Sequence, residues 1–286
     1  MHPYRPTHGR QPEHVYRLRR AIAATVAIVV LFAVVQLTGL AGGDGDDESA
    51  TTTTVEVTTT TIPPPPECAE GDLQVVEDAA NAWATVLVDT ERAIPSSYEP
   101  GDLRNIADAG FPLTDGVALR SLVLPDLSAL RQAAVDNGTP ISILAAFRSF
   151  GQQQELYDRR VEELGASEAG SRVARPGHSE HQLGTTIDVT IEGDTDVDQT
   201  WGASLTGQWI ATNAHKYGFI LSYPMETQGR TCYDYEPWHL RYVGREMAAD
   251  VIASGLTLRE YLWQLNPVPP ATTSTTTTTT TTTAAP

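Results

Sequence analysis

Two short segments of this chain carry the residues of a metal site, and any fold of the chain has to bring them together. The segments are residues 179–188 (SEHQLGTTID) and residues 236–239 (EPWH). His181, Asp188 and His239 supply two imidazoles and one carboxylate, a set that typically holds a catalytic zinc ion and leaves its fourth position open for water. Glu236 precedes His239 by three residues and is placed to take a proton from that water. Because zinc lowers the pKa of bound water towards neutrality, the pattern predicts a hydrolase.

The two segments resemble the active-site motifs of the zinc D-Ala-D-Ala carboxypeptidases of the VanY type, in the M15 peptidase group with the LAS-type metallopeptidase fold. The first family motif, Ser-x-His-x-x-Gly-x-Ala-x-Asp, is matched from Ser179 to Asp188, except that Thr186 replaces the alanine. The second motif, Glu-x-x-His, is matched by Glu236 and His239.

Further blocks extend the resemblance. Residues 147–153 (FRSFGQQ) are similar to the family segment Tyr-Arg-Ser-Tyr-x-x-Gln. Residues 217–224 (YGFILSYP) resemble the strand that leads to the second motif, and residues 238–244 (WHLRYVG) resemble the stretch that follows it. The matching blocks occur in the family's order, so the resemblance implies the family's fold and chemistry for this part of the chain.

The resemblance implies a role for each matching residue. His181, Asp188 and His239 match the ligands of one zinc ion, although another divalent ion could occupy such a site. Glu236 matches the general base that activates the water and then protonates the leaving amine. Arg148 matches the arginine that meets negative charge on the substrate, and its planar, permanently charged guanidinium suits that task.

Other roles are less specific. Gln153 and Ser179 match polar positions that line the family's substrate site. Glu236 could instead be a carboxylate that orients His239, with Asp234 as the nearest rival for the base. His178 is expected to be a wall of the site and not a fourth ligand.

The ends of the chain differ in composition from its middle. Residues 1–20 form a basic tail, and residues 21–41 are almost wholly apolar and long enough to cross a bilayer as a helix. Residues 42–67, rich in Asp, Thr and Pro, and residues 266–286, rich in Thr, cannot bury enough apolar surface to fold. Residues 68–265 are therefore the predicted zinc carboxypeptidase domain.

Charges around the apolar segment predict its orientation. Arginines precede it and acidic residues follow it, so the positive-inside rule leaves the N-terminus in the cytoplasm and the domain outside. We expect a single-pass signal anchor in the cell membrane. The alternative is a cleaved signal peptide with a small-x-small site at residues 39–41, which would release a secreted protein.

Cys68 and Cys232 both fall in the region expected to be exported, a compartment that permits a disulfide. We predict that they pair, which would hold the start of the domain beside the active-site loop. Two free thiols, or metal ligation through Cys232, are the alternatives.

The net charge of −17 argues against nucleic acid as a partner. Phosphate binding needs a basic surface, so nucleic acid is not an expected partner. No protein partner is indicated. A carboxylate-bearing substrate that enters such an acidic protein needs a local cation, which supports the role of Arg148.

Hydrophobic periodicity and turn residues predict an α+β domain. Helices are expected at residues 73–87, 125–135, 152–164, within 201–217, at 245–253 and at 256–265. Strands are expected at residues 141–147, 185–191 and 219–223, with 236–242 following, and a loop rich in Gly, Ser and Ala leads from residue 164 to Pro176. The resemblance adds that the sheet is antiparallel and forms the floor of a zinc cleft between flanking helices.

These expectations converge on a hydrolase of the bacterial cell wall. The leading hypothesis is a zinc carboxypeptidase that removes the terminal D-alanine from peptidoglycan stem peptides, with Glu236 assisting the attack of water held at the zinc. The alternatives are an L,D-carboxypeptidase or peptidoglycan endopeptidase of the same fold, and a non-catalytic wall-binding module that retains a zinc site. The three enzyme hypotheses share the same metal ligands and the same base, so these residues do not distinguish between them.

Overall fold

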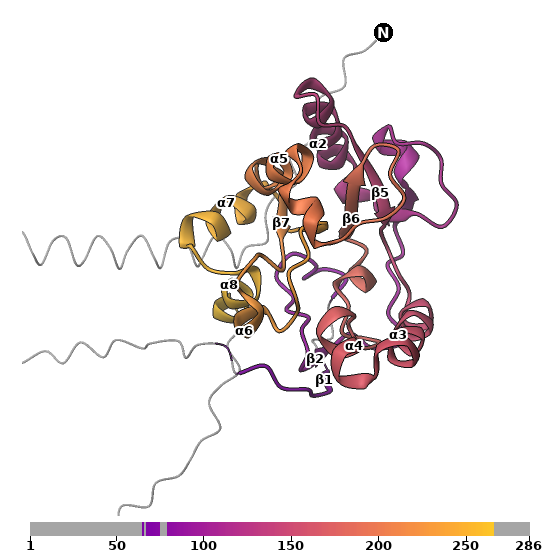
Figure 1. The fold of residues 1–286 in the computed structure, drawn as a ribbon, viewed down its shortest axis with the longest axis vertical. Coiled ribbons are helices and arrows are strands. Elements are labelled where there is room, and N and C mark those ends of the chain that lie inside the picture. The colour runs from indigo at the N-terminus through magenta and orange to yellow at the C-terminus, as the bar shows by residue number, and fades with distance from the viewer. Residues whose placement is uncertain (1–64, 66, 75–78, 266–286) are drawn as a thin grey trace, which may run out of the picture. The chain divides into compact units, whose positions relative to one another are not determined.

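The computed structural model describes residues 65, 67–74 and 79–265 (Figure 1). The predicted membrane anchor at residues 21–41, nearly all of the stalk at residues 42–67 and the tail at residues 266–286 lie outside the described residues. None of the helices in the described ranges combines the length and apolarity that a bilayer crossing requires.

A four-stranded antiparallel sheet lies at the centre of the domain, with the strand order β5-β6-β8-β7. Its strands are β5 (Ile141–Ala145), β6 (Thr186–Ile191), β7 (Phe219–Leu221) and β8 (His239–Tyr242). Two shorter sheets pair β1 (Leu73–Gln74) with β2 (Arg92–Ala93) and β3 (Leu103–Asn105) with β4 (Ala118–Arg120).

Helices surround the central sheet (Figure 1). The described α-helices are α2 (Leu124–Asp136), α3 (Phe150–Leu164), α4 (Ala166–Arg172), α5 (Leu205–Asn213), α6 (Gln228–Thr231), α7 (Arg245–Ser254) and α8 (Leu258–Leu265). Short 3-10 helices are η1 (Ile106–Ala109), η2 (Ser121–Val123), η3 (Glu180–Leu183), η4 (Gln199–Ala203) and η5 (Ala214–Tyr217).

Alternation along the strands separates the core from the site. Ile187 and Val189 of β6 and Leu240 of β8 belong to the main hydrophobic core, together with residues of α2 and α5. Successive side chains of a strand point to opposite faces, so Asp188 and His239 emerge on the other face. The sheet thus uses one face for packing and offers the other for chemistry.

Most of the predicted elements are confirmed, with small shifts at their ends. In α2, Pro125 lies in the first turn, where a missing N–H costs nothing. The helix predicted from residue 152 begins at Phe150, because Ser149 and Gln152 form a capping box. The strand predicted to reach residue 147 ends at Ala145, after a register shift between Ile143 and Ala145.

The helix predicted over residues 73–87 is wrong in the described part of that range. Leu73–Gln74 is a strand, and residues 79–87 form turns and coil. The carbonyl oxygens of Trp83 and Val86 accept hydrogen bonds of 3.1 and 2.6 Å from Nη2 of Arg241. These carbonyl groups are hydrogen-bonded to a side chain of β8. The spacing of apolar residues in this segment therefore reflects tertiary packing, which outweighs helix propensity.

The loop predicted between residue 164 and Pro176 is also wrong in part. It contains α4 (Ala166–Arg172), which follows Gly165 at a positive φ of 80° and buries Ala169. Alanine is the strongest helix former, so the small residues of this segment support a helix once one face can pack.

Candidate active site

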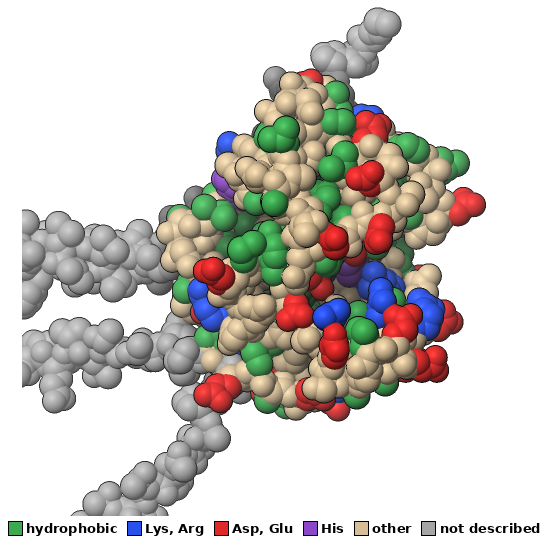
Figure 2. Space-filling view, in the orientation of Figure 1, with side chains coloured by type: hydrophobic (Ala, Val, Ile, Leu, Met, Phe, Trp, Pro, Cys, Tyr) green, Lys and Arg blue, Asp and Glu red, His purple; other side chains and the backbone are tan. Residues whose placement is uncertain are grey.

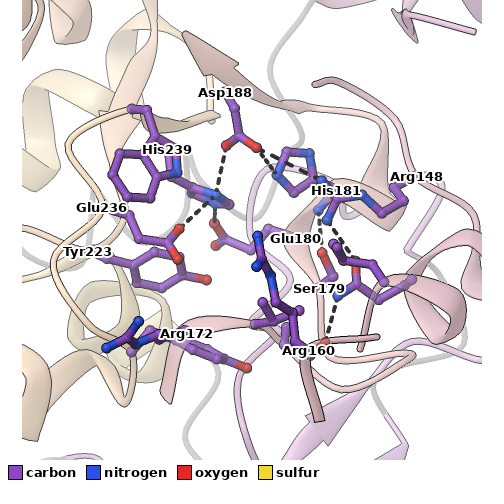
Figure 3. A pocket seen from close by; sticks show the side chains of 16 residues that line it. Arg148, Arg160, Arg172, Ser179, Glu180, His181, Asp188, Tyr223, Glu236 and His239 are labelled. Atoms are coloured by element: carbon purple, nitrogen blue, oxygen red, sulfur yellow. Dashed lines mark hydrogen bonds and ion pairs between the residues drawn. The ribbon is translucent and has the colours of Figure 1, made fainter. Parts of the chain in front are cut away.

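The predicted metal ligands meet on the polar face of the central sheet (Figure 3). Asp188 of β6 and His239 of β8 lie directly opposite each other in the sheet, with Oδ1 of Asp188 at 3.3 Å from Nδ1 of His239. His181 comes from η3, and its Nε2 lies 3.3 Å from Oδ2 of Asp188. One candidate ligand atom from each residue lies within 4.8 Å of the other two.

The turn between His181 and Asp188 depends on a glycine. Gly184 ends η3 in the left-handed region, with φ 70°. A Cβ at this position would lie 3.0 Å from side-chain carbons of Arg120 and Pro100. Glycine therefore allows both the backbone turn and the close contact that bring η3 against the start of β6.

The outer nitrogens of both imidazoles are held by the protein. Nδ1 of His181 lies 2.6 Å from the carbonyl oxygen of Ala146. Nε2 of His239 lies 2.9 Å from Oε2 of Glu180. These contacts fix the two rings with the opposite nitrogen facing Asp188, as is common for histidines that bind a metal.

The donor set fits a zinc ion. Ligands bound tetrahedrally at about 2.0–2.1 Å are roughly 3.3 Å apart, close to the separations found here. Oδ1 of Asp188 is buried and forms no hydrogen bond within the described residues. Burial lowers the pKa of His239, but the adjacent carboxylates of Asp188 and Glu180 prevail and raise it to about 10. The carboxylates that favour a proton on His239 also favour a cation at its ring, and a metal would displace that proton.

Glu236 lies beside the ligands, with Oε2 at 3.5 Å from Nδ1 of His239. The backbone N–H of Glu236 donates to the carbonyl oxygen of Tyr223, which anchors the loop before β8. Burial raises the pKa of Glu236 to about 8, although His239 and Arg148 lower it. A carboxylate with a pKa near neutrality is suited to accept and return a proton.

Arg148 approaches the site from the segment after β5. Its Nη2 lies 3.9 Å from Oδ2 of Asp188, and its Nη1 donates to Oε1 of Gln153 at 2.8 Å. Burial lowers the pKa of Arg148, while Asp188 and Glu236 raise it. Gln153 is buried and donates in turn to the carbonyl oxygen of Ala174, so it holds the guanidinium in place.

Ser179 and His178 occupy different positions around the site. Ser179 lines the cleft, and its hydroxyl accepts a hydrogen bond of 3.3 Å from the N–H of His181 at the start of η3. His178 turns away from the ligands, because its nitrogens lie 2.7 Å from the carbonyl oxygen of Asp89 and 3.2 Å from Oδ1 of Asp72. Both nitrogens are thus engaged with the N-terminal part of the domain.

Glu180 contacts a predicted metal ligand, although the sequence pattern did not single it out. Its buried carboxylate contacts His239. It also accepts a hydrogen bond of 2.9 Å from Nη1 of Arg241 and one of 2.6 Å from the hydroxyl of Ser222. Arg241 follows His239 by two residues on β8, so both side chains share a face. The two-residue spacing from His239 could have placed Arg241 at the site from the sequence. No local pattern identified its partner, Glu180.

The ligands and Glu236 open into a cleft with a volume of about 200 Å³ (Figure 3). Arg148, Gln153 and Ser179 line it as well. Tyr223, Tyr233, Arg160 and Arg172, which the sequence analysis passed over, complete much of its wall. The predicted site residues are therefore brought together in one cavity.

Cys68 and Cys232 are joined by a disulfide, with Cα atoms 5.2 Å apart. The bond links the start of the domain to the C-terminal end of α6. Cys232 lies four residues before Glu236. The cross-link thereby fixes one end of the loop that carries Glu236, and it leaves neither sulfur as a metal ligand.

Comparison with known sequences shows the family. The model of the VanY family, D-alanyl-D-alanine carboxypeptidase, matches residues 116–245. YodJ of Bacillus subtilis (strain 168), a protein named as a carboxypeptidase, is 34% identical over 200 residues, which cover 68% of this chain and 72% of YodJ. A D-alanyl-D-alanine carboxypeptidase of Enterococcus faecalis (strain ATCC 700802 / V583) is 33% identical over 189 residues, 63% of this chain and 66% of that protein.

Solved structures agree with this relationship. The LD-carboxypeptidase LdcB aligns with a TM-score of 0.60 and 32% identity, covering 68% of this chain and 94% of that one. A mutant of the vancomycin resistance D,D-pentapeptidase VanY, in complex with Zn(II), aligns with a TM-score of 0.54 and 31% identity, covering 63% of this chain and 99% of that one. The chain therefore belongs to the VanY-type family of D-alanyl-D-alanine carboxypeptidases, zinc metallopeptidases of the M15 group.

Proposed function

We propose that this protein is an extracytoplasmic zinc carboxypeptidase that removes the terminal D-alanine from peptidoglycan stem peptides. The main support is the placement of Glu236 beside the cluster of His181, Asp188 and His239 in one cleft. Similar proteins that are named D-alanyl-D-alanine carboxypeptidases support the choice of substrate.

His181, Asp188 and His239 would hold one zinc ion. When bound, zinc polarises the carbonyl under attack and lowers the pKa of water. The protein's own contribution begins with the outer contacts of the ligands, Ala146 and Glu180, which keep both imidazoles oriented before substrate arrives.

Glu236 acts as the general base and then as the general acid. Its carboxylate accepts a proton from the attacking water and returns it to the amine of the departing D-alanine. In the metal-free site, burial raises the pKa of this group to about 8, and a carboxyl group with a raised pKa is suited to accept and return a proton.

Arg148 supplies positive charge where the substrate becomes negative. It donates to the substrate carboxylate or to the oxygen that gains charge during attack, an interaction that strengthens as the charge develops. Gln153 restrains the guanidinium through the 2.8 Å hydrogen bond, so little reorganisation is needed.

An L,D-carboxypeptidase is the second candidate. It is favoured by the alignment with LdcB, whose TM-score of 0.60 exceeds the 0.54 found for VanY with Zn(II). The ligands and the base serve either reaction, so the difference lies in the stereochemistry of the residue before the scissile bond.

For the chain as a whole, we propose residues 68–265 as the catalytic domain and residues 21–41 as a membrane anchor. Basic residues before the apolar segment and acidic residues after it support an external domain.

Defined peptides test the reaction. The full-length protein is incubated with a stem pentapeptide ending in D-Ala-D-Ala and with a tetrapeptide ending in an L,D-bond, and products are weighed by mass spectrometry. We expect zinc-dependent loss of one alanine from the pentapeptide, abolished by a chelator and by Glu236→Gln. Cleavage of the tetrapeptide alone would establish the L,D-activity, and an internal cut would establish an endopeptidase.

A further inference from the structure

The outer rim of the active-site cleft carries two arginines that the proposed chemistry does not use. Arg160 of α3 and Arg172 of α4 both line the cleft that contains the metal ligands (Figure 3). In Figure 2, Lys and Arg side chains lie around the hollow in which a histidine is visible, with Asp and Glu side chains among them. The chain has 19 Lys and Arg against 36 Asp and Glu, so arginines in the wall of this cleft are notable in an acidic protein.

The two arginines lie farther out than Arg148. The side chain of Arg148 is 21% exposed and approaches Asp188, whereas those of Arg160 and Arg172 are 47% and 53% exposed. Arg148 is therefore placed for the reacting end of a substrate. Arg160 and Arg172 are placed for a part of the substrate that lies away from the scissile bond.

Their present partners hold these arginines only weakly. Arg160 pairs with Glu163 at 2.7 Å within α3, and Arg172 pairs with Glu168 at 2.8 Å within α4. Arg172 also lies 3.8 Å from Asp234. Exposed ion pairs within one helix contribute little to stability, so both guanidiniums can turn to a ligand at small cost.

The wall near the arginines suits a peptide. Leu156 of α3 and the neighbouring Val173 and Ala174 give the cleft apolar lining between its charged groups. A binding site of this kind combines apolar surface with a few polar groups that fix orientation. A peptide with small apolar side chains and one carboxylate matches both features.

We propose that Arg160 and Arg172 form a subsite for a free carboxylate on a residue upstream of the scissile bond. This inference rests on the proposed peptidase function and narrows its substrate class: peptides with a free upstream carboxylate are preferred over those in which it is an amide. A guanidinium from either helix can pair with a carboxylate oxygen through a charge-assisted hydrogen bond, for which a carboxamide is a poor substitute.

The test compares two stem peptides that differ only in a carboxylate or a carboxamide upstream of the scissile bond. The full-length zinc-loaded protein is assayed as wild type, Arg160→Gln, Arg172→Gln and the double variant. Arg159→Gln is the matched control, because Arg159 is exposed on the same helix and lies outside the cleft lining.

We expect the wild type to cleave the acid about 10-fold more efficiently than the amide, with each arginine contributing about 3-fold, as partly exposed ion pairs do. The loss should appear in KM with kcat kept, since the contact is equal in the ground and transition states. The double variant should cleave both peptides equally, and Arg159→Gln should behave as wild type.

Two outcomes separate this inference from the function on which it rests. Equal cleavage of both peptides by the wild type would refute the subsite and leave the peptidase intact. If neither peptide is cleaved, the proposed function fails, and calorimetry on zinc-loaded Glu236→Ala decides the subsite by itself. Equal Kd values for acid and amide, or no binding of either, would then overturn it.

Discussion

Glu180 accepts a hydrogen bond from Nε2 of His239 across 2.9 Å, and this contact turns Nδ1 of His239 towards Asp188. The same carboxylate is held by Arg241 and by the hydroxyl of Ser222. One buried residue thus connects the predicted metal ligand His239 to Arg241 of strand β8 and to the loop after β7.

Replacing Glu180 should weaken zinc binding. In Glu180→Gln the ring of His239 loses a charged acceptor, and outer partners of metal ligands typically contribute about 10- to 100-fold in affinity. Competition with a chromogenic chelator measures this loss. The exposed Glu192→Gln on the same chain is the control, and unchanged zinc affinity in Glu180→Gln would contradict the orienting role.

Glu180 should also make stability depend on pH in the metal-free protein. Burial opposes its ionisation, but Arg241, His239 and Ser222 prevail and lower the pKa from 4.5 to about 2. Because its pKa is lowered in the folded state, Glu180 makes its full contribution to the free energy of unfolding above pH 4.5. That contribution is lost as the pH falls towards 2. The shift corresponds to a contribution on the order of 3 kcal/mol.

Urea unfolding of the chelator-treated protein between pH 6 and pH 2.5 tests this dependence. The wild type should lose stability faster than Glu180→Gln as the pH falls, because the amide does not titrate. Parallel curves for the two proteins would show that Glu180 is not the group responsible.

Loss of Glu236 should abolish turnover while leaving zinc bound. General base catalysis typically contributes about 10²- to 10⁴-fold, so kcat of Glu236→Gln should fall by that range. Release of D-alanine and the zinc content of the purified variant are the two measurements. Asp234→Asn is the control, since Asp234 was the rival for the base in the sequence and lies outside the cleft lining, and an equal loss there would reopen the choice of base.

The disulfide should stabilise the domain strongly. It joins Cys68 to Cys232 across a sequence separation of 164 residues, and a loop of this length corresponds to about 5 kcal/mol of unfolded-state entropy as an upper value. The Cys68→Ser, Cys232→Ser double variant should therefore have a lower unfolding midpoint than the oxidised wild type. Reductant should lower the unfolding midpoint of the wild type to that of the variant and leave the midpoint of the variant unchanged. Equal midpoints without reductant would show that the disulfide is dispensable for stability.

Local sequence determined much of this protein. The ligand types at His181, Asp188 and His239 and their motif spacing predicted a zinc site, because metal chemistry restricts which side chains serve. The alternation in β6 separates Ile187 and Val189 from Asp188, so one strand supplies both core and site. Helix α2 begins and ends near its Pro and Gly signals because these residues act on their own backbone.

Tertiary structure decided the rest, through contacts between residues distant in the chain. The pairing of Asp188 with His239 follows from the register of β6 and β8, which no local pattern sets. Arg241 donates to the carbonyl oxygens of Trp83 and Val86, and the described residues 79–87 form turns and coil where a helix was expected. Glu180 gained its role in the same way, because a buried carboxylate is defined by the partners that fold around it.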